Sequence, residues 1–399
     1  MILKNVAVPQ SLAGAKLDGT ASGGCLHGDL IFTDDGPTRM EPHDPAVTTG
    51  LVLPHLTEAH CHLDKCHTID RLGPVAGDLS QAIAAQKEDR AHWTRDDLTA
   101  RMSQGLHEAA AAGCGALRSH IDWGDAAEPP QAWHILGDLQ SDTGIQIQRA
   151  ALQGIDRYAD TDYCATVARH IAQSRGGVLG AFLLNHKDRQ TGLDAVFVQA
   201  IHHGLPLDFH VDETLEDTDG LTMIADTAVR FGYEGPILCG HACNLMNLDE
   251  DAFKRLADKL AGTNIFVCAL PTTNLYLQSR GKGTPDRRGI TRLKELQAAD
   301  VPILLGSDNV GDAFCPTGQH DPLAALHLGV LAAHLDPPFD QWLPAITTTA
   351  RRAMGLDQKT VAQAGPGDLA VWHTSSIADL IAGRGGPATT VHDWIKSTN

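Results

Sequence analysis

The feature that most constrains the fold of this 399-residue chain is a regular succession of short apolar runs separated by helical segments. The runs are bounded by Gly, Pro or Asp, which is typical of strands buried on both faces of a parallel sheet. They cover residues 51–56, 114–122, 145–153, 177–184, 205–213, 236–243, 264–271 and 301–309. Eight strand–helix units in this length predict an α/β fold, a (β/α)8 TIM-like barrel.

The two ends of the chain depart from this pattern. Residues 1–50 contain short alternating stretches punctuated by Gly and Asp, and the segment 364–373 has the pattern of a strand. We predict that residues 1–50 and 356–399 form a small β-sandwich unit beside a catalytic barrel of residues 51–355. The alternative is that each end is a separate appendage.

Composition and charge exclude several classes of function. A net charge of −18 argues against nucleic acid as a partner, because phosphates demand basic patches. The nine cysteines are odd in number and lack a Cys-x-x-Cys pair, which indicates buried free thiols in a reducing compartment. Neither a secretory leader nor an apolar run of ~18 residues is evident. We therefore expect a cytoplasmic homo-oligomer that binds a small molecule and does not bind a membrane.

Chemically capable side chains gather where the predicted strands end, which is where catalytic groups of a β/α barrel project. They are His60, His62, His120, Asp122, Gln153, His210, Asp212, Glu213, His241 and Asp308. With 21 histidines in the chain, about one His-x-His pair is expected by chance, so the pair alone means little. Its place after the first run is what makes it informative.

A metal site follows from the chemistry of these side chains. His60 and His62 are alternate residues and share one face of a strand. An imidazole from His210 and a carboxylate from Asp308 would complete a mixed N and O site for one divalent ion. Such an ion lowers the pKa of a bound water from about 15.7 to roughly 7.

Two more residues have catalytic chemistry beside this site. Glu213 lies three residues after His210, close enough to the strand end to exchange protons with a substrate. His241 would hold the metal-bound water or stabilise a developing oxyanion.

Several stretches resemble motifs of the amidohydrolase superfamily, and in particular of its cytosine deaminase branch. The stretch LPHLTEAHCHLDK (53–65) is similar to the opening His-x-His motif. DFHVDE (208–213), CGHACNL (239–245) and LGSDNVGDAFCPTG (305–318) resemble the motifs of strands five, six and eight. TPDRRGITRLKEL (284–296) resembles a segment of cytosine deaminases and N-isopropylammelide amidohydrolases. The likeness runs in order from about residue 50 to residue 355.

This resemblance implies one zinc or iron ion on His60, His62, His210 and Asp308. It also implies that Glu213 moves protons to the ring nitrogen, that His241 assists the hydrolytic water, and that Asp308 accepts a proton from that water.

The expected substrate contacts are Gln153, Asn309 and Phe314. In the family, a glutamine matching Gln153 hydrogen-bonds the amide edge of the ring. Asn309 stands where the cytosine deaminases have a second aspartate, and Phe314 stands where they have tryptophan. Both departures leave the metal ligands intact and lie where a ring substrate would be held.

We therefore predict a hydrolytic deaminase of a cytosine-like pyrimidine or a related amino-substituted nitrogen heterocycle. A triazine N-dealkylating amidohydrolase and a cyclic amide hydrolase are alternatives that use the same site. A catalytically silent barrel that only binds a small molecule is the alternative from another class.

Four nearby residues have structural interpretations. His120 and Asp122 either orient a ligand or pack structurally, and Asp64 and Lys65 are expected to form a salt-bridged loop. Binuclear relatives use a carboxylated lysine, but no such motif surrounds Lys187, which lies three residues beyond run 177–184. We therefore expect one metal ion per chain.

Overall fold

The larger of two sheets is a closed parallel barrel. The computed structural model describes residues 1–15, 17–33, 38–73, 77–140, 143–216, 218–280, 284 and 289–398. A parallel bridge between Cys61 and Asp308 joins the first barrel strand to the segment after the last. The strands follow in chain order: β6 (Leu56–Cys61), β7 (Cys114–Asp122), β8 (Gln146–Leu152), β9 (Gly177–Leu183), β10 (Leu207–Val211), β11 (Ile237–His241), β12 (Ile265–Ala269) and β13 (Ile303–Leu305).

Seven of these strands lie within the predicted runs, but the prediction that 51–56 forms the first barrel strand is wrong. Residues 50–54 form β5 (Gly50–Pro54), which pairs with strands of the other sheet, and β6 begins at Leu56. Both strands are completely buried, so no alternation separates them in the sequence. Because β6 extends to Cys61, His60 lies within the strand and His62 directly follows it.

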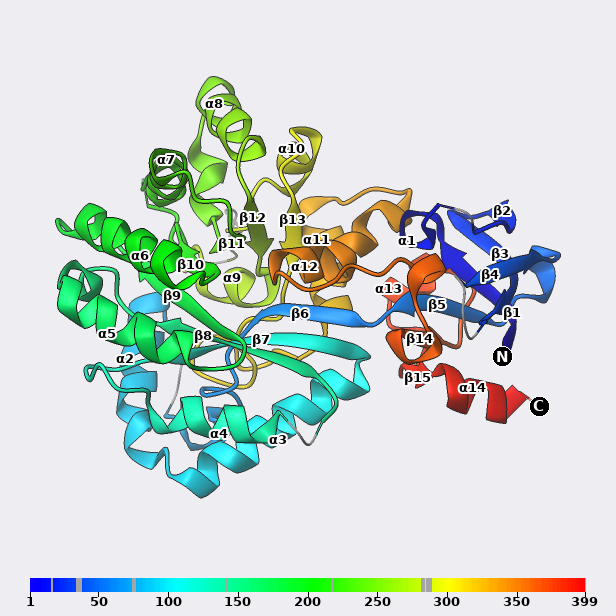
Figure 1. The fold of residues 1–399 in the computed structure, drawn as a ribbon, viewed down its shortest axis with the longest axis horizontal. Coiled ribbons are helices and arrows are strands. Elements are labelled where there is room, and N and C mark those ends of the chain that lie inside the picture. The colour runs from blue at the N-terminus through cyan, green and yellow to red at the C-terminus, as the bar shows by residue number, and fades with distance from the viewer. Residues whose placement is uncertain are drawn as a thin grey trace.

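Helices surround the barrel (Figure 1). Thr94 caps α3, because its hydroxyl accepts the backbone N–H of Asp97 at 3.2 Å. Residues 285–288 of the predicted 284–296 motif lie outside the described residues. The outer helices are α3 (Arg95–Ala111), α4 (Gln131–Leu139), α5 (Thr161–Ala172), α6 (Arg189–His203), α7 (Gly220–Phe231), α8 (Glu250–Ala261), α10 (Leu293–Ala298) and α11 (Pro322–Ala333). The shorter or inserted helices are α2 (Leu79–Asp89), α9 (Pro271–Leu277) and α12 (Thr348–Ala353).

The two ends of the chain form the second unit, at the right of Figure 1. Its mixed sheet has the order β15-β14-β5-β1-β3-β2, with β4 beside β3. Since the C-terminal strand β14 pairs with β5, the ends belong to one unit, and the alternative of separate appendages is wrong. The fold class is confirmed. The elements are β1 (Ile2–Pro9), α1 (Gln10–Ala13), β2 (Thr20–Ser22), β3 (Cys25–Ile31), β4 (Arg39–Pro42), β14 (Leu369–Trp372), α13 (Ile377–Ile381), β15 (Thr389–Thr390) and α14 (Val391–Thr398).

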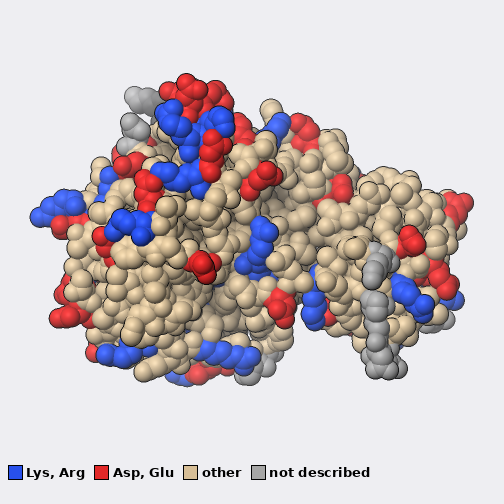
Figure 2. All heavy atoms as spheres, turned by 45° about the horizontal axis from the view of Figure 1, so that its top comes forward, with Lys and Arg blue, Asp and Glu red and all other residues tan. Residues whose placement is uncertain are grey.

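Burial and surface charge complete the description. All nine cysteines are buried and unpaired, as predicted. On the face shown in Figure 2, acidic and basic side chains are interspersed. On α8, Lys254 and Asp258 form an exposed ion pair at 2.8 Å. Among the described residues, no helix combines the length and apolar character that crossing a membrane requires.

Candidate metal centre and active site

Histidines from four neighbouring or facing strands converge at one end of the barrel. His60, His120, His210 and His241 come from β6, β7, β10 and β11, and His62 follows β6 directly. All five are buried, and so is Asp308, which follows β13. Their nitrogen and carboxylate atoms form overlapping groups whose members lie within 4.8 Å of one another, which suits a divalent metal ion. The predicted residues are therefore together in space.

The separations between the predicted ligand atoms fit one ion. His62 Nε2 lies 3.0 Å from His210 Nε2 and 3.2 Å from Asp308 Oδ1, and His60 Nε2 lies 3.6 Å from the same oxygen. Bonds of about 2.0–2.1 Å in tetrahedral geometry place two ligand atoms roughly 3.3 Å apart. We call His60, His62, His210 and Asp308 the ligand cluster.

The protonation states of this cluster also suit a cation. Burial lowers the pKa of His60, His62 and His210 well below the ordinary value, so their imidazoles are neutral and keep a lone pair. Within the described residues, neither ring nitrogen of His60 and neither oxygen of Asp308 has a hydrogen-bond partner. Buried polar atoms without partners are costly, and coordination would satisfy them.

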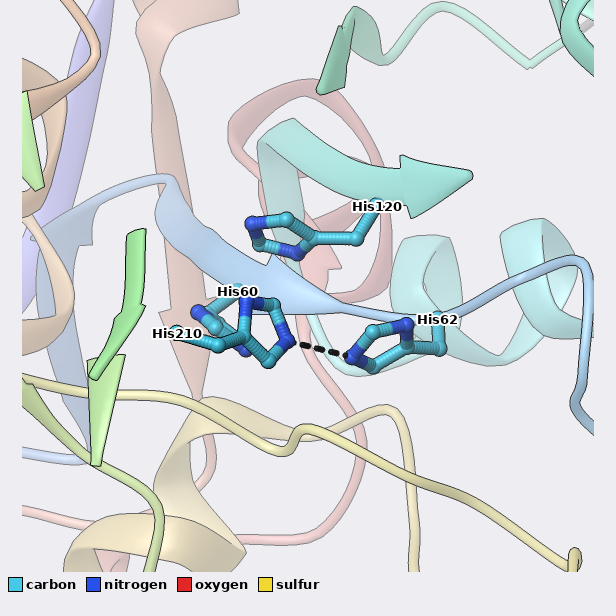
Figure 3. A group of neighbouring side chains, drawn as sticks. All are labelled: His60, His62, His120 and His210. Atoms are coloured by element: carbon cyan, nitrogen blue, oxygen red, sulfur yellow. Dashed lines mark hydrogen bonds between the residues drawn. The ribbon is translucent and has the colours of Figure 1, made fainter. Parts of the chain in front are cut away.

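His120 belongs to one of the candidate groups, but its ring nitrogens are already engaged. Nε2 lies 2.9 Å from Asp208 Oδ1, and Nδ1 lies 3.3 Å from the carbonyl oxygen of Cys61. Its ring stacks at a tilt on His60 with centroids 4.1 Å apart. Figure 3 shows His120 projecting from β7 beside the other rings, while His62 and His210 face each other. His120 therefore packs beside the ligand cluster with both ring nitrogens engaged, and whether it orients a ligand or packs structurally stays open, as in the sequence analysis.

A buried charge network lies behind His120. Arg118 Nη1 donates to the second oxygen of Asp208 at 2.7 Å, and Nε and Nη2 donate to Gln148 Oε1 at 3.0 and 2.7 Å. The side chains of Arg118, Asp208 and His120 are all completely buried. Desolvated charges persist only where they are paired, so this network is highly organised.

Glu58 holds the first and last barrel strands together beneath the cluster. One of its oxygens accepts the backbone N–H of His60 at 3.0 Å, and the other accepts that of Ser307 at 3.1 Å. Burial raises the pKa of this carboxyl to about 8. Glu58 therefore links the backbone of His60, on the first barrel strand, to the backbone of Ser307, which precedes Asp308 after the last strand. These two hydrogen bonds fix the position of His60 relative to Asp308.

Glu213 and His241 face each other beside the ligand cluster. Glu213 Oε1 lies 3.8 Å from His241 Nδ1, and the Glu213 side chain is 15% exposed. Burial, followed by the charge of Asp308, raises the pKa of Glu213 to about 8. Asn274 Nδ2 donates to His241 Nδ1 at 3.1 Å, which leaves the proton of the neutral ring on Nε2. The site thus offers a protonated carboxyl and an unpartnered ring N–H.

Left-handed backbone residues cluster at this end of the barrel. His241 has φ +73°, Ala242 +49°, Asp212 +51° and Asp308 +59°. Residues with a side chain rarely adopt this conformation, which costs about 1–3 kcal/mol where the surroundings impose it. Such strain is typical of functional sites, where the position of a side chain is fixed at the cost of an unfavourable backbone conformation.

A cavity of about 310 Å³ opens over the site and contains the predicted substrate contacts. Gln153 lines it, but its amide is engaged with Tyr163 Oη at 2.7 Å, the Gly154 N–H at 2.8 Å and the Gly124 carbonyl. Asn309 and Phe314 line it as well, and Asn309 Nδ2 donates to Asp312 Oδ2 at 2.7 Å. Their contact with substrate stays a prediction.

The residues predicted to be structural have distinct positions. Lys65 pairs at 2.9 Å with Asp122, while Asp64 accepts the backbone N–H of Asp122 at 2.8 Å. Lys65 and Asp122 both line the cavity. Lys65 was predicted from the sequence as part of a salt-bridged loop only, and its place in the cavity wall was not anticipated. Asp212 accepts N–H groups at the start of α7 and is structural. Lys187 is exposed and lies outside the cavity and the candidate metal groups.

Another candidate metal group consists of Cys66, His67 and His320. The Cys66 thiol already donates to the carbonyls of Leu63 and Arg101, at 3.2 and 3.5 Å. A thiolate facing two carbonyl oxygens is disfavoured, so this group is a poor metal site.

Sequence reasoning missed three supporting carboxylates: Glu58, Asp208 and Asp312. Asp312 is buried and accepts the N–H groups of Phe314 at 2.8 Å and Cys315 at 3.0 Å, which shapes the loop after β13. The sequence did carry a signal for two of them, because Glu58 and Asp208 stand two positions before a histidine inside an otherwise apolar run. A charge in such a run needs a buried partner.

Comparisons with known proteins identify the family and agree with this fold. The model of the amidohydrolase family matches residues 70–382. A pterin deaminase of Rhizobium rhizogenes is 32% identical over 396 residues, which cover 96% of this chain and 90% of that protein. The structure of a 5-methylcytosine deaminase from Klebsiella pneumoniae, liganded with phosphonocytosine, superposes with a TM-score of 0.82 at 22% identity, covering 98% and 97% of the chains. An N-isopropylammelide isopropylaminohydrolase from Burkholderia multivorans gives 0.72 at 20%, covering 97% and 96%.

Proposed function

This chain belongs to the amidohydrolase family, and from that premise we propose that it is a metal-dependent hydrolytic deaminase of a small amino-substituted nitrogen heterocycle. The observation that carries the proposal is a protonatable carboxyl, Glu213, beside His241 and the ligand cluster at the base of a cavity. An acid with a raised pKa next to a metal site is the combination that amine departure from a ring requires.

The ligand cluster would hold one zinc or iron ion. When bound, such an ion supplies Lewis-acid chemistry and lowers the pKa of water toward about 7. The neutral imidazoles and the unpaired atoms of Asp308 support this assignment. A single ion is proposed because Lys187 lies away from the cluster.

The side chains divide the proton transfers between them. Asp308 accepts a proton from the attacking water while its oxygen bonds to the ring carbon that bears the exocyclic amine. Glu213 donates its proton to the adjacent ring nitrogen, and His241 Nε2–H donates a hydrogen bond to the new oxygen. The bond to the exocyclic nitrogen then breaks as that nitrogen takes up the proton held by Asp308 and leaves as ammonia. The new hydroxyl group gives its proton to Glu213, so the ring carbon becomes a carbonyl and both carboxyl groups regain their starting states.

Within this class we place pterins first, followed by cytosine-like pyrimidines and aminotriazines. The support is the identity to the pterin deaminase over nearly the full length of both chains. Asn309 and Phe314, which differ from the cytosine deaminase pattern, favour a ring other than cytosine. Triazine N-dealkylation and cyclic amide hydrolysis are the alternative outcomes.

The test is a screen of pterins, aminopyrimidines and aminotriazines for ammonia, with protein loaded with zinc or with iron. We expect ammonia from at least one ring and a Glu213→Gln variant that keeps its metal but loses most turnover. Glu216→Gln, three residues further on and exposed, is the matched control and should retain turnover. Release of an alkylamine would indicate triazine N-dealkylation instead, and ring opening would indicate cyclic amide hydrolysis. Unchanged turnover in Glu213→Gln would refute the mechanism.

A further inference from the structure

Gln86, on α2, is a buried amide that the protein itself leaves without partners. Its side chain is 3% exposed, and neither Nε2 nor Oε1 makes a hydrogen bond within the described part of the chain. Leaving a buried donor or acceptor unsatisfied is costly, and natural structures contain few such groups. Among the described residues the amide has no partner, so a bound molecule is a natural candidate to supply one.

The position of Gln86 identifies where that partner binds. Gln86 lines the same cavity as Glu213, His241 and Asn309. By contrast, the amide of Gln153 in this cavity is engaged by protein groups at both its nitrogen and its oxygen. Gln86 is thus a cavity amide whose nitrogen and oxygen are both without a partner among the described residues, and both can meet a substrate.

The α2 helix is held firmly, so Gln86 cannot easily turn toward solvent. At its C-terminal end, Asp89 accepts from Arg71 Nε at 2.6 Å and from Trp93 Nε1 at 2.8 Å. One turn before Gln86, Ala82 packs in a cluster that includes Phe314 of the cavity wall. This anchoring orients the amide in advance, which lowers the entropy cost of binding.

We propose that Gln86 is a specificity-determining residue that hydrogen-bonds an edge of the ring on which an N–H lies beside a carbonyl or a ring nitrogen. A glutamine amide presents one acceptor beside two donors, which pair with such an edge through two parallel bonds. Gln86 makes no polar contact with Glu213 or the ligand cluster, so the edge it meets is away from the reacting carbon. This inference rests on the proposed function and names the substrate class as lactam- or amidine-edged rings.

The test compares Gln86→Met with the parent and with Gln81→Met, an exposed position on the same helix. Methionine keeps the length of the side chain and removes its polar atoms. For the best substrate among pterin, cytosine and ammeline, we expect kcat/KM to fall about 10- to 100-fold in Gln86→Met, mainly through KM. Gln81→Met should match the parent.

A second measurement separates recognition from a structural role. For the analogue in which the edge N–H is methylated, parent and Gln86→Met should differ by less than about 3-fold, since the contact is already lost. The thermal midpoint of Gln86→Met should equal or exceed that of the parent, because a buried unsatisfied amide has been removed. A lowered midpoint with unchanged discrimination between the two compounds would overturn the proposal.

Binding of the same compounds, followed by calorimetry, distinguishes this proposal from the proposed function. If the parent binds a ring through Gln86 but releases no ammonia, deamination fails and the role of Gln86 stands. If ammonia is released equally by the parent and Gln86→Met, with equal discrimination, the role of Gln86 fails and deamination stands. Absence of both binding and turnover would overturn both.

Discussion

Replacing Asp208 with leucine should expose the cost of the charge network behind the metal centre. The substitution leaves the guanidinium of Arg118, which has 0% exposed side-chain area, without its anion and removes the acceptor of His120 Nε2. Breaking one half of a buried pair costs about 3–5 kcal/mol in the free energy of unfolding. For 399 residues the entropy of unfolding is roughly 0.8 kcal/mol/K, so the thermal midpoint should fall by about 4–6 °C.

A double-mutant cycle provides the decisive assay. In Arg118→Met/Asp208→Leu no unpaired charge remains, so the double variant should be more stable than Asp208→Leu by about 1 kcal/mol or more. Urea unfolding of metal-loaded protein would measure all four corners, and Asp258→Ala, in an exposed pair on α8, should leave the midpoint unchanged. A loss below about 1 kcal/mol in Asp208→Leu, or additive losses in the double variant, would refute the reasoning.

Three further outcomes are expected. Glu213 must be protonated to act as the acid, and its pKa is raised to about 8. Turnover should therefore be steady below that pH and decline as the pH rises through it. A pH–rate profile should show this decline in the parent and not in Glu213→Gln. Elemental analysis should find one ion per chain in the parent and almost none in His62→Ala, whereas two ions would contradict the one-metal site. Burial, followed by the charge of His67, lowers the pKa of His320 in the native state to about 3. The unfolded chain takes up a proton on this side chain below about pH 6.5, whereas the native state does not. The free energy of unfolding therefore falls as the pH drops below 6.5. Between pH 6.5 and 5 that loss is about 2 kcal/mol by urea unfolding, and His320→Gln should lack it; an equal pH dependence would disprove the assignment.

Much of the candidate site was predictable from the sequence because it depends on local pattern. Strands buried on both faces appear as apolar runs, and residues at their carboxyl ends meet at one end of a barrel whatever the loops between them do. The positions of His210 and Asp308 follow from this rule, whereas His62 follows β6 and not the predicted run 51–56. The buried state of four cysteines follows similarly from the apolar runs that contain them: Cys114, Cys239, Cys243 and Cys268.

What only the tertiary structure decided are partnerships between residues far apart in the chain. His120 and Asp208 are 88 positions apart, and no periodicity shows that they pair and thereby engage a ring nitrogen that would otherwise be a candidate ligand atom. The assignment of β5 to one sheet and β6 to the other also depends on which neighbours each strand pairs with, because both strands are completely buried. The unpartnered amide of Gln86 is likewise visible only once the cavity around it is closed. Local pattern determines which face a residue occupies, but hydrogen-bond partners depend on distances that only the folded chain sets.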